Sequence, residues 1–231
     1  MIKELEWDSN FWNIKIADCT YENDNEINEY LNNKNVDLIQ TQVNINKTES
    51  IRKLENLNFK FIDLNITYCI SLDSYNMSAE KYIIANEQNV NDIENMAGQV
   101  FISSRYNVLS IEKTKEFYKL WASKSVLGKL DDVCLIEKNE KDELEGFVTV
   151  KKISEETARI GLIGVNPAHQ NKSVGTKLIN HAKNYLVLKG VKRLFVSTQG
   201  SNIVAQNFYI RNGFKVYDVS AWLYLFLSKQ Y

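Results

Sequence analysis

The positions of hydrophobic and polar residues predict alternating strands and helices along most of the chain. An apolar, β-branched run over residues 158–165 predicts a strand, and glycines within such a run, here Gly161 and Gly164, are typical of a bulge or of a close approach by a ligand. Pro167, the only proline, cannot continue a central strand, so this strand should end just before it. The apolar stripe that follows at helical spacing consists of Leu178, Ile179, Ala182, Tyr185 and Leu186.

The alternation typical of strands and the 3.6-residue spacing typical of helices also predict the remaining elements. Further strands are expected over residues 36–45, 59–70, 82–85, 133–137, 146–151, 194–198 and 214–227, and further helices over 47–57, 90–101, 111–127 and 203–212. Residues 23–35 also carry apolar positions at helical spacing, and Thr48 is the expected cap of the next helix. Because residues 73–79 are polar and aperiodic, we divide the chain into an N-terminal α/β domain (1–78) and a second domain (79–231).

A short polar stretch, residues 170–176, joins the strand that ends near residue 165 to the next helix. A helix that opens with Ser173, Gly175 and Thr176 leaves backbone N–H groups unpaired, and the helix dipole adds partial positive charge at the same end. Together these features form a site suited to phosphate or pyrophosphate. An ordinary strand–loop–helix unit without a ligand explains the pattern equally well, because such helix starts are common.

Composition narrows the class of protein. The chain has 231 residues, 44% hydrophobic and 25% charged, which is typical of a globular protein that buries a substantial core. Its net charge of -1 argues against nucleic acid as the main partner, which would favour a basic face. The N-terminus lacks the apolar region of a signal peptide, and no apolar run is long enough to span a membrane, so we expect a cytoplasmic protein.

The cysteines and histidines show no metal-binding pattern. Cys19, Cys69 and Cys134 are isolated and odd in number, so we expect reduced and mostly buried thiols. His169 and His181 have no partner at ligand spacing, and each is expected at a solvated position. We therefore expect no metal site.

The strand end, the polar turn and the start of the helix together form a motif that is more specific than any of them alone. V-x-P-x-x-Q-x-x-x-x-G-x-x-L, from Val165 to Leu178, resembles the coenzyme A-binding motif of the GCN5-related N-acetyltransferase (GNAT) superfamily. The family's usual Gln/Arg-x-x-Gly-x-Gly/Ala has a glycine where Ser173 stands, and Gly175 occupies the second glycine position. Serine still leaves the backbone N–H accessible, and its side chain can cap the helix.

A second motif lies further along the chain. Asn202-x-x-Ala205-x-x-Phe208-Tyr209-x-x-x-Gly213-Phe214 resembles the other signature of the superfamily. The resemblance implies that Asn202 contacts the coenzyme and that Tyr209 is the catalytic residue near the thioester sulfur. A phenol there can donate a hydrogen bond to the departing thiolate. Taken alone, Tyr209 would be interpreted as a core aromatic residue on an amphipathic helix.

The resemblance also implies a fold and a co-substrate. We expect the GNAT acyl-CoA N-acyltransferase fold, a mixed and mostly antiparallel sheet splayed at the coenzyme site, with a smaller N-terminal α/β layer. Acetyl-CoA or another acyl-CoA would be a co-substrate, not a permanently bound cofactor. The backbone of Ile163 and Val165 would hold the pantetheine. The pyrophosphate would be held by Asn171, Lys172, Ser173, Val174, Gly175 and Thr176.

Several stretches are similar to a narrower group, the bacterial N-acyltransferases of dTDP-linked amino-dideoxyhexoses. They include Leu5–Asp8, Ser103–Tyr106, Phe117–Trp121, Ala158–Val165 and Trp222–Tyr224. This similarity implies acyl transfer to a dTDP-linked 3- or 4-amino-dideoxyhexose for surface polysaccharide (O-antigen or capsule) synthesis. It determines neither the sugar isomer nor the acyl chain.

Four residues are candidates for binding this acceptor. Arg105 could pair with the pyrophosphate of the sugar nucleotide in a bidentate manner. Tyr106, Tyr118 or Trp121 could stack on thymine or on the sugar face. For Trp121, packing of its helix against the sheet is an equal alternative.

Three questions stay open at this stage. No carboxylate lies between Ile160 and Val165, so the attacking amine is expected to lose its proton to water. The acceptor could instead be a protein N-terminus, a lysine or an aminoglycoside, or the chain could be a non-catalytic acyl-CoA-binding module. The final strand is apolar on both faces, which predicts cover by a helix or by a second subunit, and we expect a homodimer.

Overall fold

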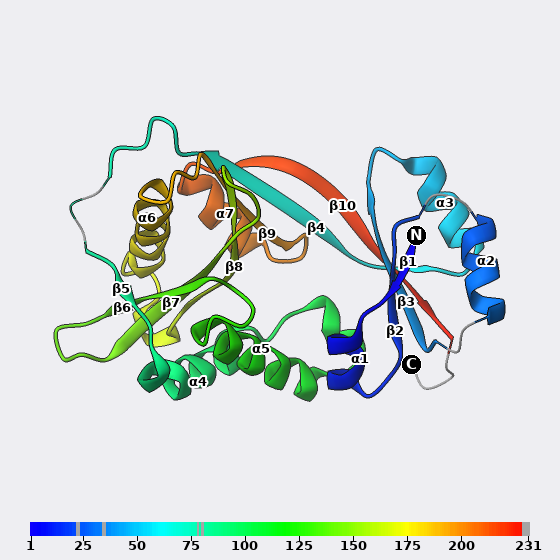
Figure 1. Cartoon of the computed structure of the whole chain (residues 1–231), viewed down its shortest axis with the longest axis horizontal. Coiled ribbons are helices and arrows are strands. Elements are labelled where there is room, and N and C mark those ends of the chain that lie inside the picture. Colours follow the sequence, from blue (N-terminus) through cyan, green and yellow to red (C-terminus); the bar gives the residue numbers. More distant parts are fainter. Residues whose placement is uncertain (22–23, 34–35, 78, 80, 228–231) are drawn as a thin grey trace.

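One sheet runs through the whole molecule, and helices cover both of its faces (Figure 1). The computed structural model describes residues 1–21, 24–33, 36–77, 79 and 81–227. The sheet has ten strands in the order β1-β2-β3-β10-β4-β9-β8-β7-β6-β5. The strands are β1 (Ile2–Glu4), β2 (Ile16–Cys19), β3 (Leu38–Asn44), β4 (Lys60–Ser71), β5 (Ile83–Ile84), β6 (Val133–Lys138), β7 (Leu144–Lys152), β8 (Thr157–Val165), β9 (Arg193–Gln199) and β10 (Lys215–Phe226).

Apart from α1, which the sequence pattern did not predict, the helices follow the predicted positions closely. They are α1 (Glu6–Trp12), α2 (Asp24–Asn33), α3 (Thr48–Asn56), α4 (Val90–Val100), α5 (Ile111–Val126), α6 (Val174–Val187) and α7 (Ile203–Arg211), with short 3-10 helices η1 (Glu87–Asn89), η2 (Arg105–Val108) and η3 (Pro167–His169). β6, β7 and β8 form an antiparallel meander. β8 and β9 pair in parallel, so the sheet is mixed and mostly antiparallel as expected.

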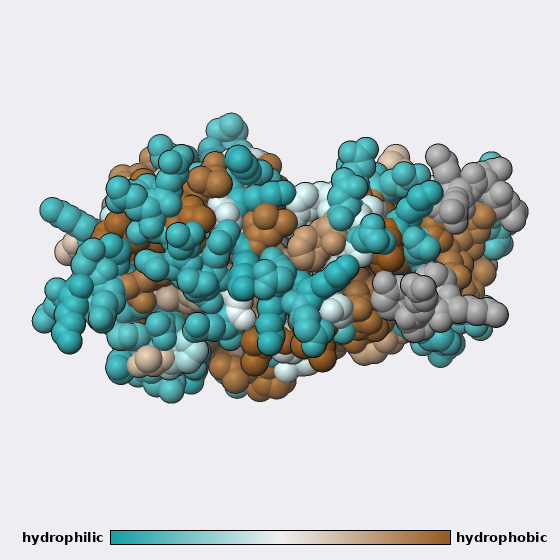
Figure 2. All heavy atoms as spheres, turned by 90° about the horizontal axis from the view of Figure 1, so that it is seen from below, coloured by the Kyte–Doolittle hydropathy of each residue, from teal (hydrophilic) through white to brown (hydrophobic). Residues whose placement is uncertain are grey.

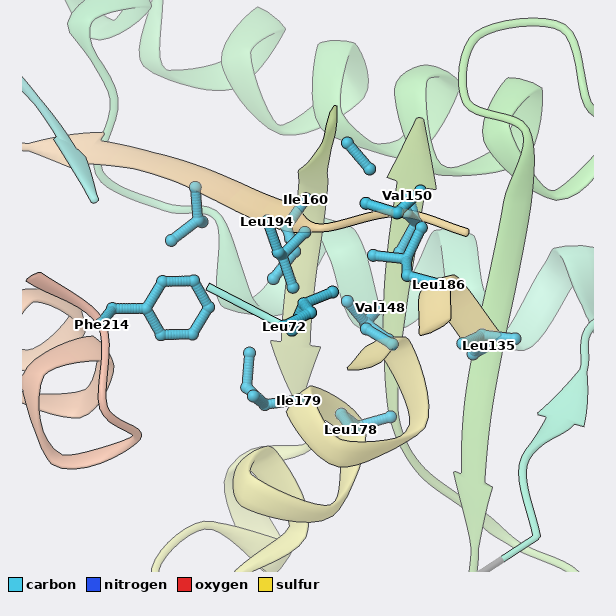
Figure 3. Packing of buried hydrophobic residues seen from close by; sticks show 14 of the residues in the cluster. Leu72, Leu135, Val148, Val150, Ile160, Leu178, Ile179, Leu186, Leu194 and Phe214 are labelled. Atoms are coloured by element: carbon cyan, nitrogen blue, oxygen red, sulfur yellow. The ribbon is translucent and has the colours of Figure 1, made fainter. Parts of the chain in front are cut away.

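The core of the C-terminal half forms where α6 packs on β6 to β9. Leu178, Ile179 and Leu186 of α6 are fully buried against apolar side chains of these strands (Figure 3). Each such leucine or isoleucine contributes about 1.5–3 kcal/mol to stability through burial. This packing holds the start of α6 beside the end of β8. On the opposite face of the sheet, α4 and α5 cover β6 to β8.

The two halves of the chain share the sheet through β4 and β10. β10 lies between β3 and β4, and β4 pairs with β9, so strands from both ends of the sequence alternate in the middle of the sheet. The division into domains 1–78 and 79–231 stays a prediction, and any boundary between such domains crosses this shared sheet.

The central place of β10 explains its apolar faces. Leu223 and Leu225 pack into a cluster on the side of α2 and α3, and Tyr224 packs into an aromatic cluster with Trp12 of α1. Both faces are therefore covered within the chain, so the pattern needs no second subunit. The homodimer stays a prediction.

Several local expectations were wrong. The cap position of α3 is Lys47 and makes no side-chain cap, so Thr48 is not the cap. Ser173 does occupy the cap position of α6, but it has a φ of 64° and its side chain caps nothing. His181 is 2% exposed, whereas a solvated position was expected.

The buried His181 belongs to a small polar cluster between α6 and β6. Its Nε2 lies 2.8 Å from a carboxylate oxygen of Glu137, and Lys177 donates to the other oxygen at 2.7 Å. Burial alone would raise the pKa of Glu137, but hydrogen bonds from His181 and Lys177 outweigh it and lower that pKa. The packing of α6 on β6 therefore buries His181, which the sequence analysis expected at a solvated position.

The outer surfaces are mixed. Seen from the side of α4, α5 and α1, most of the molecule is hydrophilic and the hydrophobic residues gather in separate patches (Figure 2).

No helix in the described ranges is long and apolar enough to cross a membrane. The three cysteines form no disulfide, with Cys19 and Cys134 buried and Cys69 partly exposed.

Candidate active site

The sheet opens where β8 leaves β9. The two strands pair from Thr157 opposite Arg193 to Ile160 opposite Val196, and no pairing follows, although both strands continue. At the same point the pairing of β8 with β7 is irregular between Val148 and Val150, which places a bulge at Gly161. A bulge bends its strand, so β8 turns away from β9 and leaves a gap between them.

A cleft of about 1270 Å³ occupies this gap and reaches both faces of the sheet. On the face of α6 and α7 it is lined by residues 173–176 and Tyr209, and on the face of α4 and α5 by Tyr118 and Trp121. Among the residues that the structure describes, no Asp or Glu lines the cleft. The charged side chains of the lining are Arg105, Arg159, Arg193 and Arg211, with His169 able to add a charge when protonated. An acid-free cleft lined by arginines favours anionic ligands.

The turn between β8 and α6 supplies bare backbone amides to the cleft. Within the described residues, the N–H groups of residues 171–176 donate no hydrogen bond to backbone or side chain. Asn171 and Ser173 have φ angles of 61° and 64°, the left-handed conformation that turns successive amides toward one side. The start of α6 is therefore an anion site formed by backbone groups.

The predicted coenzyme residues do not all lie in the cleft. Asn171, Ser173, Gly175 and Thr176 line it, whereas Lys172 is exposed and does not. Val174 also borders the cleft, but its side chain is buried in the core, so only its backbone is available to a ligand.

The remaining predicted coenzyme contacts come from β8 and α7. Ile163 and Val165 lie on the part of β8 that no longer pairs with β9, and both border the cleft. Asn202 borders it too, but the side-chain oxygen of Asn202 caps α7 by accepting from the N–H of Ala205 at 3.0 Å. Only the amide NH₂ of Asn202 therefore remains for a ligand.

Tyr209 lies on α7 and borders the cleft from the coenzyme side. Its ring is 4% exposed and packs against Tyr68, Phe208 and Phe214 at centroid distances of 5.7, 5.4 and 5.8 Å. Its hydroxyl makes no hydrogen bond with the described residues. Burial, with a smaller effect from Tyr68, raises the pKa of Tyr209, so this phenol keeps its proton at neutral pH.

An aromatic wall faces the cleft on the other side of the sheet. Phe101 stacks on Tyr118 at 4.8 Å, and Tyr118 is nearly parallel to Trp121, with 7° between the rings and 6.1 Å between their centroids. The Tyr118 hydroxyl is 3.0 Å from that of Ser104. The predicted acceptor residues Tyr118 and Trp121 are thus neighbours with parallel rings in the lining of the cleft.

Arg105 and Tyr106 form the far end of this wall, on η2. The guanidinium of Arg105 lies between the rings of Tyr106 and Trp222, 4.1 and 3.9 Å from their centroids. It donates to Gln40 at 2.8 Å, to the hydroxyl of Tyr106 at 2.6 Å, and to the hydroxyl of Tyr224. Arg105 therefore has a structural role that the sequence did not reveal, and only part of its N–H donors remain for a ligand.

Helix α1 packs against η2 through aromatic side chains. Trp7, Phe11 and Trp12 of α1 pack with Tyr106 and Phe117 in one aromatic cluster, with Trp12 stacked on Tyr106 at 5.7 Å. The aromatic residues near the start of the chain thus position the loop that carries Arg105.

The sequence did not identify several residues that border the cleft. Trp222 comes from β10, Thr67 from β4, and Arg159 and Arg193 from the paired part of β8 and β9. Their positions depend on which strands pair, so none of them was named as a site residue, although Arg159 and Trp222 lie in stretches that resemble the dTDP-amino-sugar acyltransferases. No group of three His, Cys, Asp or Glu within the described ranges lies close enough to hold a metal ion.

Comparisons with known proteins add a family and a fold. Residues 98–214 match the model of the family described as Acetyltransferase (GNAT) family. The chain is 25% identical over 188 residues, 80% of each protein, to the dTDP-fucosamine acetyltransferase of Escherichia coli O6:H1.

Two solved structures show the same fold. A GCN5-related N-acetyltransferase of Sphaerobacter thermophilus matches with a TM-score of 0.59 at 14% identity, over 82% of this chain and 59% of that one. A conserved protein of unknown function from Staphylococcus epidermidis matches with a TM-score of 0.60 at 14% identity, over 91% and 83%. At these identities the two structures support the likeness of fold alone.

Proposed function

The chain belongs to the acetyltransferase (GNAT) family, and from this premise we propose that it transfers an acyl group from acyl-CoA to the amino group of a dTDP-linked 3- or 4-amino-dideoxyhexose. The product would serve surface polysaccharide synthesis. The observation that carries the proposal is the acid-free, arginine-lined cleft that joins bare amides on one face of the sheet to an aromatic wall on the other. The relative with the dTDP-fucosamine name supports the choice of acceptor.

In this proposal the coenzyme enters from the face of α6 and α7. The amides of residues 171–176 hold the pyrophosphate, and the unpaired edge of β8 at Ile163 and Val165 pairs with the pantetheine. The NH₂ of Asn202 contributes one further hydrogen bond. The thioester then reaches the gap between β8 and β9 near Tyr209.

The acceptor enters from the face of α4 and α5. Its amine attacks the thioester carbonyl carbon directly and forms the new C–N bond. The tetrahedral intermediate then collapses, the C–S bond breaks, and the leaving thiolate takes the proton of the Tyr209 hydroxyl, which regains a proton from water. The amine releases its own proton to water, since no Asp or Glu of the described residues lines the cleft. Tyr118 and Trp121 stack on the nucleoside or sugar, while Tyr106 and the remaining N–H groups of Arg105 contact its polar groups.

We expect the pH dependence to report the acceptor, not an enzymatic base. The value of kcat/KM should rise with pH until the acceptor amine is in its free-base form and then stay level to about pH 10, the usual pKa of a tyrosine. No fall is expected before that point, because burial raises the pKa of Tyr209 and keeps it protonated. A pH–rate profile measures this directly.

Two carboxylates bonded to residues at the rim of the cleft provide the control for that profile. Asp63 accepts from Ser201 at 2.7 Å, and Glu145 lies 2.8 Å from His169. The variants Asp63→Asn and Glu145→Gln should keep the rising limb of the profile. If either substitution abolishes turnover in a folded protein, release of the proton to water is wrong.

A thiol-release assay across acceptors tests the substrate class. We expect kcat/KM for the best dTDP-amino-dideoxyhexose to exceed that for an aminoglycoside or a lysine peptide by at least about 100-fold, which corresponds to about 2.7 kcal/mol. Polycations are disfavoured because the cleft is lined by arginines and by no carboxylate. Highest turnover with a peptide or an aminoglycoside would contradict the sugar-nucleotide proposal and leave another GNAT activity. Binding of acyl-CoA without turnover of any amine would indicate a non-catalytic module.

A further inference from the structure

A buried carboxylate lies directly behind the bulge of β8. The side chain of Asp131 is fully buried, and its Oδ2 accepts three hydrogen bonds, from Thr149 at 2.7 Å, from Ser125 at 2.9 Å and from the indole N–H of Trp121 at 3.4 Å. A buried charge is costly unless it is paired and hydrogen-bonded. Asp131 thus ties α5, β7 and the bulge of β8 together behind the residues that line the cleft.

The other carboxylate oxygen of Asp131 has a cation nearby but no hydrogen-bond donor among the described residues. Oδ1 is buried and accepts no hydrogen bond from the described residues. Its nearest cation is Arg159, whose Nη2 lies 3.7 Å away, which is an ion pair but too long for a hydrogen bond. The carboxylate therefore attracts the guanidinium of Arg159 without using up its N–H groups.

Arg159 presents an unused guanidinium to the cleft. Its side chain is 41% exposed and borders the cleft on the face of α5, one residue before the pairing of β8 with β9 ends. No hydrogen bond of its N–H groups to another described residue is present. Arg105 differs, because Gln40, Tyr106 and Tyr224 already accept from its two terminal nitrogens.

We propose that Arg159 binds a phosphate of the acceptor's diphosphate, and that Asp131 is the positioning residue that holds Arg159 and Trp121 side by side. The assignment rests on the proposed function and identifies the anion subsite within it. A free guanidinium fork suits the two oxygens of a phosphate. Trp121, fixed by the same carboxylate, offers an adjacent flat surface for the sugar or the base. Arg105 then acts mainly as a structural support of η2.

Binding of thymidine 5′-diphosphate, compared with thymidine, isolates the contribution of the phosphates. We expect Arg159→Gln to weaken binding of the diphosphate by about tenfold or more and to leave thymidine binding unchanged. The KM for the amino sugar should rise by a similar factor, while the KM for acyl-CoA stays constant. Arg159→Lys keeps the charge but loses the planar fork of N–H donors. Its affinity for the diphosphate should lie between those of the unmodified protein and of Arg159→Gln. Isothermal titration calorimetry and initial rates supply these values.

The role of Asp131 is tested by a double-variant cycle. Asp131→Asn alone should also weaken diphosphate binding, but in the Arg159→Gln background it should add less than about twofold, because Asp131 acts through Arg159. Asp132→Asn is the matched control, since Asp132 is exposed and accepts only from the backbone of Lys152 at 2.7 Å. Full additivity of the two substitutions would overturn the positioning role.

Two results separate the possible failures. If Arg159→Gln binds the diphosphate as tightly as the unmodified protein while Arg105→Gln loses it, the diphosphate lies on Arg105 and the assignment to Arg159 is overturned, with the sugar-nucleotide function intact. If the unmodified protein binds the diphosphate no better than thymidine and acylates no dTDP-amino sugar, the proposed function fails and the subsite with it. Acyl-CoA binding by each variant confirms that it is folded.

Discussion

Replacing Tyr209 with phenylalanine should lower kcat by about two orders of magnitude or more, the range expected when a general acid is lost. The substitution removes one oxygen from a ring that stays packed between Tyr68, Phe208 and Phe214. The phenol keeps its proton at neutral pH because burial raises its pKa, so its O–H is available as a hydrogen-bond donor when negative charge develops on the leaving sulfur. Without the hydroxyl, the thiolate must leave with no donor beside it.

The kinetic measurement needs a matched control. Acyl-CoA affinity should be unchanged in Tyr209→Phe, because in the proposed complex the amides of residues 171–176, which make no other hydrogen bond among the described residues, hold the coenzyme and this ring does not. Tyr68→Phe removes a neighbouring hydroxyl from a ring that does not border the cleft and should keep most of the turnover. Equal loss in both variants, or full turnover in Tyr209→Phe, would remove Tyr209 from the mechanism.

Replacing Gly161 with alanine should destabilise the protein by about 1–3 kcal/mol, the usual cost of overpacking a filled site, and should abolish most activity. A Cβ at this position would lie 2.2 Å from Oδ2 of Asp131 and 2.8 Å from the hydroxyl of Thr149. Both atoms belong to a buried network, so neither can move away freely. Thr149 also accepts from the N–H of Leu162 at 2.8 Å, and the displacement therefore reaches the backbone of the bulge.

Thermal unfolding and the two KM values measure this effect, and Gly98 supplies the control. A Cβ at Gly98 would meet the end of the flexible side chain of Lys119, which can swing aside. Because glycine is unfavourable inside a helix by about 0.5–1 kcal/mol relative to alanine, Gly98→Ala should be neutral or stabilising. A Gly161→Ala protein with normal stability and normal kinetics would show that the bulge tolerates a side chain and that its geometry is not critical.

The candidate site was predicted best where its parts are close in sequence. The end of a strand before Pro167, the polar turn and the apolar stripe of α6 all lie within some thirty residues, and the structure has them at the expected places. Tyr209 and Asn202 are found within one helix and its cap. Their roles in coenzyme binding and catalysis stay predictions.

Parts of the site that depend on distant residues were not predicted. Arg105 was expected to be free for a ligand, but its partners come from β3 and β10. His181 was expected in solvent, yet the packing of α6 on β6 buries it beside Glu137. The sequence did not identify Asp131 as a site residue, because its role depends on contacts with Thr149 and Gly161.

The sequence by itself determined the family, the strand–turn–helix unit that presents bare amides, and the position of the catalytic candidate. The strand–turn–helix unit depends on periodicity, glycine and proline, which act over a few residues of backbone. The family and the catalytic candidate were inferred from the resemblance of two short motifs to that family. Only the tertiary structure decided that β10 inserts between β3 and β4, that the two halves share one sheet, and that Asp131 lies behind the bulge. Pairing between strands such as β3 and β10, with Asn44 bonded to Asp218, is governed by burial of the whole sheet. No local pattern records which distant strand completes that burial.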